Sequence, residues 1–120
     1  MRIACDIDDT LWMLVKDDSP RPISGVGTIC ACGVPLKQVK DDILVKFIHS
    51  LILERHDIFL WSAGGVEFVR QWVKLNAPAW DGLVEIIPKE KGHDIDICFD
   101  DMEVDLAKVN LRIKRDHSDH

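Results

Sequence analysis

Residues 2–10 of the 120-residue chain read RIACDIDDT, and this stretch decides the fold. Arg2 to Asp6 is a short apolar run that ends in an acid, which is typical of a strand buried in a parallel sheet. Asp6 and Asp8 are either turn or helix-capping residues or part of a functional site. An acid at the end of a buried strand is costly without a function, so the sequence favours a site.

The rest of the chain alternates helical and extended patterns. Apolar residues recur at three- and four-residue steps over Leu36–Arg55, which predicts a helix, and a second helix is expected from Gly64-Gly65 to the stop at Asn76-Ala77-Pro78. Further strands are predicted at Asp57–Ser62, Leu83–Ile87, Ile95–Phe99 and Asn110–Ile113, with a helical turn over Glu103–Lys108. This order predicts a three-layer, Rossmann-like α/β domain with a mainly parallel five-stranded sheet covered on both faces.

The segment Trp12–Pro35 breaks this alternation. It contains three prolines and three glycines, which exclude a regular helix and favour a loop or a twisted hairpin. A connection of this length inside a compact domain is usually functional. We therefore expect a lid or flap inserted after the first strand.

Composition limits the class of protein. At 120 residues the chain is expected to form one domain, and its net charge of −6 argues against general attraction to nucleic acid or anionic membranes. No apolar stretch approaches the roughly 20 residues of a membrane span, and the early acidic residues do not fit a secretory leader, so we expect a cytoplasmic protein. Cys30 and Cys32 form a lone CxC, which is a weak signal for a metal site.

Polar residues follow the predicted strands where each one ends. These residues are Asp6 and Asp8, then Ser62 with Ala63 and Gly64, then Lys89, and finally Asp100 and Asp101. Ligands bind at the carboxyl ends of parallel strands, so all of them should meet at one edge of the sheet. Two like charges 4 Å apart cost about 4 kcal/mol at an effective dielectric constant near 20, so four crowded carboxylates need a cation. Carboxylate oxygens favour Mg²⁺.

The same set of residues suits phosphoryl transfer. Ser62 and the amides after it stand where a strand opens into a helix, which is a natural cradle for phosphate. Lys89 can offset the charge of a phosphoryl group. Asp8 can donate and accept a proton if its neighbours raise its pKa above the ordinary value of about 3.9.

The motif DIDDTL, a strand ending in Ser62, a lysine and a strand ending in Asp100-Asp101 occur in an order that resembles the haloacid dehalogenase (HAD) superfamily. The resemblance extends from the start of the chain to Asp101 and points to a small capless phosphatase. It implies that Asp6 is the nucleophile that forms an aspartyl-phosphate and that Asp8 is the general acid and base. It further implies that Ser62, Ala63, Gly64 and Thr10 bind phosphate. Lys89 and Lys91 both qualify as the lysine that stabilises phosphate, and Lys89 is preferred because it directly follows the apolar strand. The implied ligands for Mg²⁺ are Asp6, Asp100, Asp101 and the carbonyl of Asp8. Many family members have glycine at the position of Asp9, so Asp9 is expected to be a turn residue.

Several alternatives remain open from the sequence. The substrate is expected to be a small phosphate ester or a nucleotide, but an open site also suits a polynucleotide end, a phosphoprotein or a second subunit that acts as a lid. A HAD-like core that binds without turnover is the main non-enzymatic alternative. A phospho-acceptor receiver domain would need its aspartate at the end of the third strand, and a Toprim-like nuclease would need a glutamate first and DxD late. This chain has neither pattern.

Overall fold

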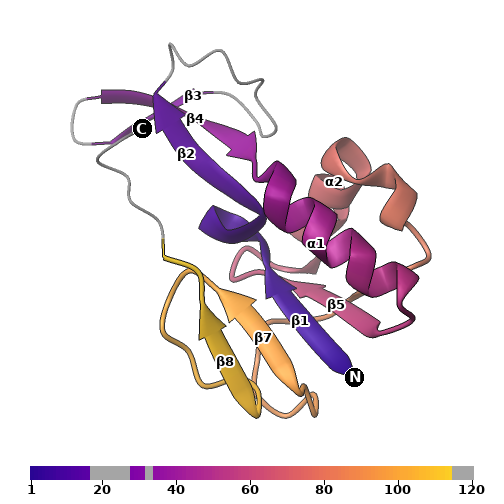
Figure 1. The fold of residues 1–120 in the computed structure, drawn as a ribbon. Helices are drawn as coiled ribbons and strands as arrows, with labels where there is room; N and C mark the ends of the chain where they lie inside the picture. The colour runs from indigo at the N-terminus through magenta and orange to yellow at the C-terminus, as the bar shows by residue number, and fades with distance from the viewer. Residues whose placement is uncertain (17–27, 32–33, 115–120) are drawn as a thin grey trace.

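The computed structural model describes residues 1–16, 28–31 and 34–114, with side chains for residues 1–13 and 39–114. Its main sheet has five strands in the order β6-β5-β1-β7-β8 (Figure 1). The bounds are β1 (Arg2–Asp6), β5 (Asp57–Trp61), β6 (Glu85–Ile86), β7 (Ile97–Asp100) and β8 (Val109–Arg112). Every neighbouring pair in this sheet is parallel, which confirms the predicted five-stranded parallel sheet.

Two helices connect the first three strands of this sheet, α1 (Asp42–Leu53) and α2 (Val66–Asn76), and a short 3₁₀ turn, η2 (Pro78–Trp80), follows them. Gly65 precedes α2 with φ of +98°, a conformation that glycine adopts readily, so the predicted start of this helix is confirmed. The predicted start of the first helix at Leu36 is wrong. Asp41 caps α1 by accepting a hydrogen bond from the Leu44 amide at 3.0 Å, and the residues before it form a strand.

Both helices cover the same face of the sheet. Ile3 and Cys5 of β1 belong to one core cluster with Ile48 of α1 and Trp72 of α2. The opposite face carries a second cluster, which non-helical segments cover: Ala4, Phe59, Trp61, Ile95 and Cys98, with Ile87, Val104, Leu106 and Ala107 packed against them. The structure therefore corrects the expected three-layer arrangement, because the described residues form no second layer of helices.

The helical turn predicted over Glu103–Lys108 is also wrong, since this segment is irregular and contains no helical turn. The Asn110 side chain organises it instead. Its Oδ1 accepts hydrogen bonds from the amides of Leu106 and Ala107 at 2.9 and 3.0 Å, and its Nδ2 donates to the Ala107 carbonyl at 2.9 Å. A side chain thus satisfies backbone groups that a helix would have paired internally.

A second, antiparallel sheet follows the first strand in the order β2-β4-β3. Its strands are β2 (Trp12–Lys16), β3 (Thr28–Ala31) and β4 (Val34–Lys40). A wide turn, η1 (Ile7–Leu11), in which Asp8 and Asp9 have non-helical backbone angles, leads into this sheet from β1. Of the two expectations for Trp12–Pro35, extended hairpin pairing is the one seen in the described residues. The Cys30 side chain and Cys32, which form the CxC pair, lie outside the described part of the chain.

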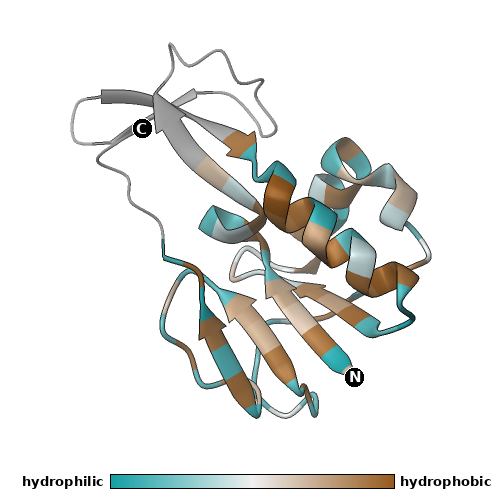
Figure 2. Cartoon of the chain, viewed as in Figure 1, coloured by the Kyte–Doolittle hydropathy of each residue, from teal (hydrophilic) through white to brown (hydrophobic). Residues whose placement is uncertain are grey.

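Neither α1 nor α2, nor any other helix in the described ranges, has the length and apolar character needed to cross a bilayer. The apolar residues lie mainly where the two core clusters pack against the faces of the sheet. Apolar residues concentrate on the central strands and on α1, as Figure 2 shows. At the carboxyl end of the parallel sheet, β1 ends in Asp6 and β7 ends in Asp100, and the candidate site lies there.

Candidate active site

Asp6 is the centre of the site. It ends β1, the middle strand of the sheet, and only 2% of it is exposed to solvent. Its Oδ2 accepts a hydrogen bond from the Thr10 hydroxyl at 3.3 Å, and its Oδ1 lies 3.2 Å from the Lys89 ammonium. A buried carboxylate needs such partners, because an unpaired charge at this depth would be strongly destabilising.

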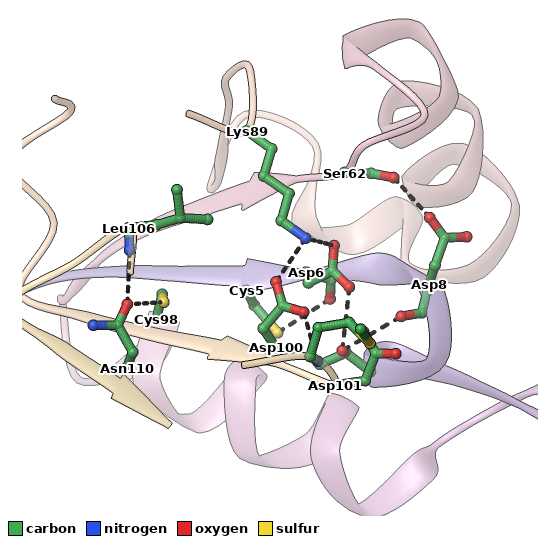
Figure 3. A network of polar contacts seen from close by, with 12 residues as sticks. Cys5, Asp6, Asp8, Ser62, Lys89, Cys98, Asp100, Asp101, Leu106 and Asn110 are labelled. Atoms are coloured by element: carbon green, nitrogen blue, oxygen red, sulfur yellow. Dashed lines mark hydrogen bonds and ion pairs between the residues drawn. The ribbon is translucent and has the colours of Figure 1, made fainter. Parts of the chain in front are cut away.

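Asp100 and Asp101 complete an acidic cluster at the end of the neighbouring strand β7 (Figure 3). One carboxylate oxygen from each of Asp6, Asp100 and Asp101 lies within 4.8 Å of the other two. Asp100 is fully buried, its Oδ2 lies 2.6 Å from the Lys89 ammonium, and its Oδ1 accepts from the Met102 amide at 2.9 Å. Lys89 therefore bridges two of the three carboxylates.

Burial controls the charges of this cluster. Desolvation, followed by repulsion from Asp100, raises the pKa of Asp6 from 3.8 to about 7, even though Lys89 opposes the shift. Burial and the adjacent Asp100 also raise the pKa of Asp101. Burial acts to lower the pKa of Lys89, but hydrogen bonding to Asp100 and attraction by both carboxylates outweigh it and raise that pKa. The lysine therefore stays protonated, whereas Asp6 is poised between its two states near neutral pH.

Asp8 lies apart from this cluster. Its exposed carboxylate accepts a hydrogen bond from the Ser62 hydroxyl at 2.8 Å, and the Ser62 hydroxyl accepts one from the Gly64 amide at 3.0 Å. Four crowded carboxylates were expected, and the structure brings together three. The fourth, Asp8, pairs with the hydroxyl at the end of β5, as Figure 3 shows.

The wide turn η1 places Asp6, Asp8 and Thr10 around one bend. Asp9 has φ of +57° there, a left-handed conformation that makes it a turn residue, as predicted. Thr10 is fully buried, and its hydroxyl reaches both the Asp6 carboxylate and, at 3.5 Å, the Asp8 carbonyl. This position suits the orientation of Asp6 better than the predicted contact with phosphate.

Among the other predicted phosphate ligands, Ser62 is buried and Ala63 and Gly64 are exposed at the surface. A side chain at Gly64 would approach the Phe68 ring to 3.2 Å, so the backbone here is tightly packed. The segment from Ser62 to Gly64 thus combines a buried hydroxyl with accessible backbone next to Asp8.

The structure separates the two candidate lysines. Lys91 is 72% exposed and pairs with exposed Asp105 at 3.0 Å, whereas Lys89 is 16% exposed and contacts Asp6 and Asp100. The sequence preference for Lys89 therefore agrees with the geometry.

Two residues that sequence reasoning missed hold the loop of Lys89. The Arg2 guanidinium donates to the carbonyls of His93 and Asp94 at 2.8 and 3.0 Å, and the His93 Nε2 lies 3.0 Å from the Pro88 carbonyl. Since β1 carries both Arg2 and Asp6, one strand fixes the aspartate and anchors the loop of its lysine. No sequence spacing signals these contacts, because backbone carbonyls accept them.

The donor set fits a hard divalent cation. Three carboxylates with oxygens this close together offer the ligands that Mg²⁺ prefers, and they carry more negative charge than one lysine offsets. Asp6, Asp100 and Asp101 are therefore the residues that could hold a metal. No family model, curated protein or solved structure gave a significant match to the chain.

Proposed function

We propose that the protein is a Mg²⁺-dependent phosphatase of the HAD type that hydrolyses phosphate monoesters through an aspartyl-phosphate on Asp6. The observation that carries the proposal is the position of Asp6, buried at the end of the central strand within reach of Lys89 and beside Asp100 and Asp101. A purely structural buried acid would need a partner such as Lys89, but it would not need two further acids beside it, because they add charge repulsion. The order of the motifs along the chain, which resembles the HAD superfamily, supports the same activity.

The reaction assigns separate tasks to Asp6 and Asp8. A carboxylate oxygen of Asp6 attacks phosphorus, the bond from phosphorus to the ester oxygen breaks, and Asp8 gives that leaving oxygen a proton. Water then attacks the phosphorus of the aspartyl-phosphate, Asp8 accepts a proton from the water, and inorganic phosphate leaves Asp6. The exposed position of Asp8 suits proton exchange with a leaving group, and the burial of Asp6 suits a nucleophile.

Ser62 and Lys89 would bind the oxygens of the phosphoryl group that Asp6 attacks. The Ser62 hydroxyl, which donates to Asp8 at 2.8 Å, would turn its hydrogen bond to a phosphate oxygen when substrate binds. Lys89 would offset charge on Asp6 and on the transferred group. Mg²⁺, held by Asp6, Asp100, Asp101 and the carbonyl of Asp8, would supply the positive charge that a dianionic ester needs in this acidic site.

The direct test measures hydrolysis of p-nitrophenyl phosphate with Mg²⁺ and with EDTA. We expect activity only with Mg²⁺, complete loss in Asp6→Asn, and retention in Asp105→Asn, an exposed acid that pairs with Lys91 outside the site. Trapping of a hydroxylamine-sensitive phosphoprotein in wild type but not in Asp6→Asn would identify the covalent step. A wild-type protein that is folded, saturated with Mg²⁺ and inert on every phosphate ester tested would refute the proposal.

Small phosphate monoesters, including nucleotides, are the substrate class that we assign to this site. A panel of sugar phosphates, nucleotides, phosphopeptides and 3′- or 5′-phosphorylated oligonucleotides would test that assignment. Preference for the oligonucleotides or the phosphopeptides would replace it.

A further inference from the structure

On the side of the main sheet where both helices pack, no helix of the described residues covers the edge strand β8. Strand β8 pairs with β7 so that Val109 lies beside Ile97 and Leu111 beside Phe99. These four residues share the face that carries α1, because Phe99 belongs to the same core cluster as Ile48 of α1. Phe99 is only 8% exposed, whereas Val109 is 48% and Leu111 44% exposed.

One flank of α1 borders this uncovered area. Ile43 and Phe47 are four residues apart on the helix, so they lie on the same side, and they are 83% and 45% exposed. The Phe47 ring packs edge-on against Phe99 with centroids 5.8 Å apart, which fixes this flank beside β7. We call Ile43, Phe47, Val109 and Leu111 the β8 patch. Figure 1 shows no described helix over β7 and β8.

Such a patch is unusual for this architecture. Parallel sheets are normally covered on both faces, because each face is apolar. The four residues of the β8 patch carry no charge, although the chain as a whole has a net charge of −6. A charged partner would have nothing to recognise at these four side chains.

The area of the β8 patch matches one half of a small dimer interface. A large apolar residue has roughly 150–250 Å² to bury, so the four exposed fractions leave on the order of 400 Å² of apolar surface. A standard interface buries about 800 Å² per partner, of which a little over half is apolar. The β8 patch therefore supplies about the apolar area that each copy of a stable dimer needs.

The geometry points to a second copy of this chain as the partner. The β8 patch combines a helix ridge, Ile43 and Phe47, with a flat strand surface, Val109 and Leu111. In a two-fold dimer the ridge of each copy packs on the strand surface of the other, so the patch is complementary to itself. Each copy then gives β8 of its partner the helical cover that α1 and α2 give β1 and β5 in the same chain.

The test measures mass by light scattering across a range of micromolar concentrations. Wild type is expected to be a dimer. Ile43→Lys, at an exposed helix position that tolerates lysine, is expected to raise the dissociation constant by roughly 30-fold or more, as expected for a hot-spot residue. Leu53→Lys is the matched control, because Leu53 is 69% exposed on the same helix but lies beside His49 and Trp80, away from β8. It is expected to leave the dimer intact.

Mixing two variants tests the exchanged packing itself. Ile43→Lys and Val109→Glu should each be monomeric. An equimolar mixture should recover dimers that contain one copy of each variant. In such a dimer, one contact pairs the lysine introduced at position 43 with the glutamate introduced at position 109, and the other pairs native Ile43 with native Val109. A monomeric wild type, an unaffected Ile43→Lys dimer, a dimer broken by Leu53→Lys, or a mixture without recovery would each overturn the inference. The inference depends only on the fold, so it can fail while the phosphatase activity stands, and the reverse also holds.

Discussion

Substitution of Asp6 by asparagine should stabilise the metal-free protein at alkaline pH. Asp6 is 2% exposed, and burial together with Asp100 raises its pKa from 3.8 to about 7. The folded protein therefore holds a proton on Asp6 over a pH range in which the unfolded chain has lost it. Asparagine keeps the shape of the protonated side chain and cannot ionise.

The sign and size of the effect follow from linkage. The folded state binds more protons than the unfolded chain, because the pKa of Asp6 is higher when the protein is folded. The contribution of this carboxyl to the free energy of unfolding is therefore fully present below pH 3.8 and is lost as the pH rises through about 7. At 1.36 kcal/mol per pKa unit the whole loss is on the order of 4 kcal/mol, of which about 3 kcal/mol falls between pH 5 and pH 8. The raised pKa of Asp101 adds a loss of the same sign. Mg²⁺ reverses the loss, because it binds the ionised carboxylates of the folded state.

The assay is urea unfolding at pH 5 and pH 8, in EDTA and in excess Mg²⁺. In EDTA, the free energy of unfolding of Asp6→Asn should fall much less than that of wild type between pH 5 and pH 8. At pH 8 the variant should be the more stable of the two proteins. Excess Mg²⁺ should stabilise the variant only a little. Asp105→Asn, at an exposed acid, should follow wild type. Equal stability of metal-free wild type at pH 5 and pH 8, or an unchanged slope in Asp6→Asn, would refute the crowded, buried site.

Three further predictions concern neighbouring residues. Lys89→Met should abolish activity and destabilise the protein by about 3 kcal/mol, because it leaves two buried carboxylates without their bridging cation, whereas exposed Lys91→Met should change neither activity nor urea stability. At pH 8 in EDTA, Asp101→Asn should raise the melting temperature and Asp8→Asn should not, because Asp8 pairs with Ser62 outside the acidic cluster; equal shifts would contradict this separation. Asp9→Gly should be about 1 kcal/mol more stable to urea than Asp9→Ala, since alanine is strained at φ of +57°; equal stabilities would mean that the turn is not left-handed.

The strands of the parallel sheet were predictable because buried apolar runs bounded by polar residues have few other interpretations. The start of α1 was not. Leu36 and Val39 continue the three- and four-residue spacing of the helix, so periodicity alone extended it backwards over β4. What decides the boundary is the Asp41 cap and the pairing of β4 with β2 and β3, and strand pairing is not a local property of the sequence.

The absence of a second helical layer from the described residues has a similar cause. Crossovers between parallel strands are usually helical, so a helical turn was expected over Glu103–Lys108. Asn110 satisfies the amides of Leu106 and Ala107 from its place on β8, and one polar side chain thus replaces a turn of helix. An asparagine on a strand gives no sign of this task until its neighbours are known.

Much of the site could be placed from sequence, because in a parallel sheet the strand ends meet at one edge. Topology brought Asp6, Lys89 and Asp100 together but left the orientation of side chains open, and orientation is what separates Asp8 from the acidic cluster. That separation has a chemical consequence. An acid inside the cluster would share its charge repulsion and would stand among the metal ligands, whereas an acid beside Ser62 at the surface is open to a bound substrate. The turn at Asp9 therefore does more than reverse the chain, since it places Asp6 and Asp8 of one motif in two environments, which suits the two different roles that we propose for them.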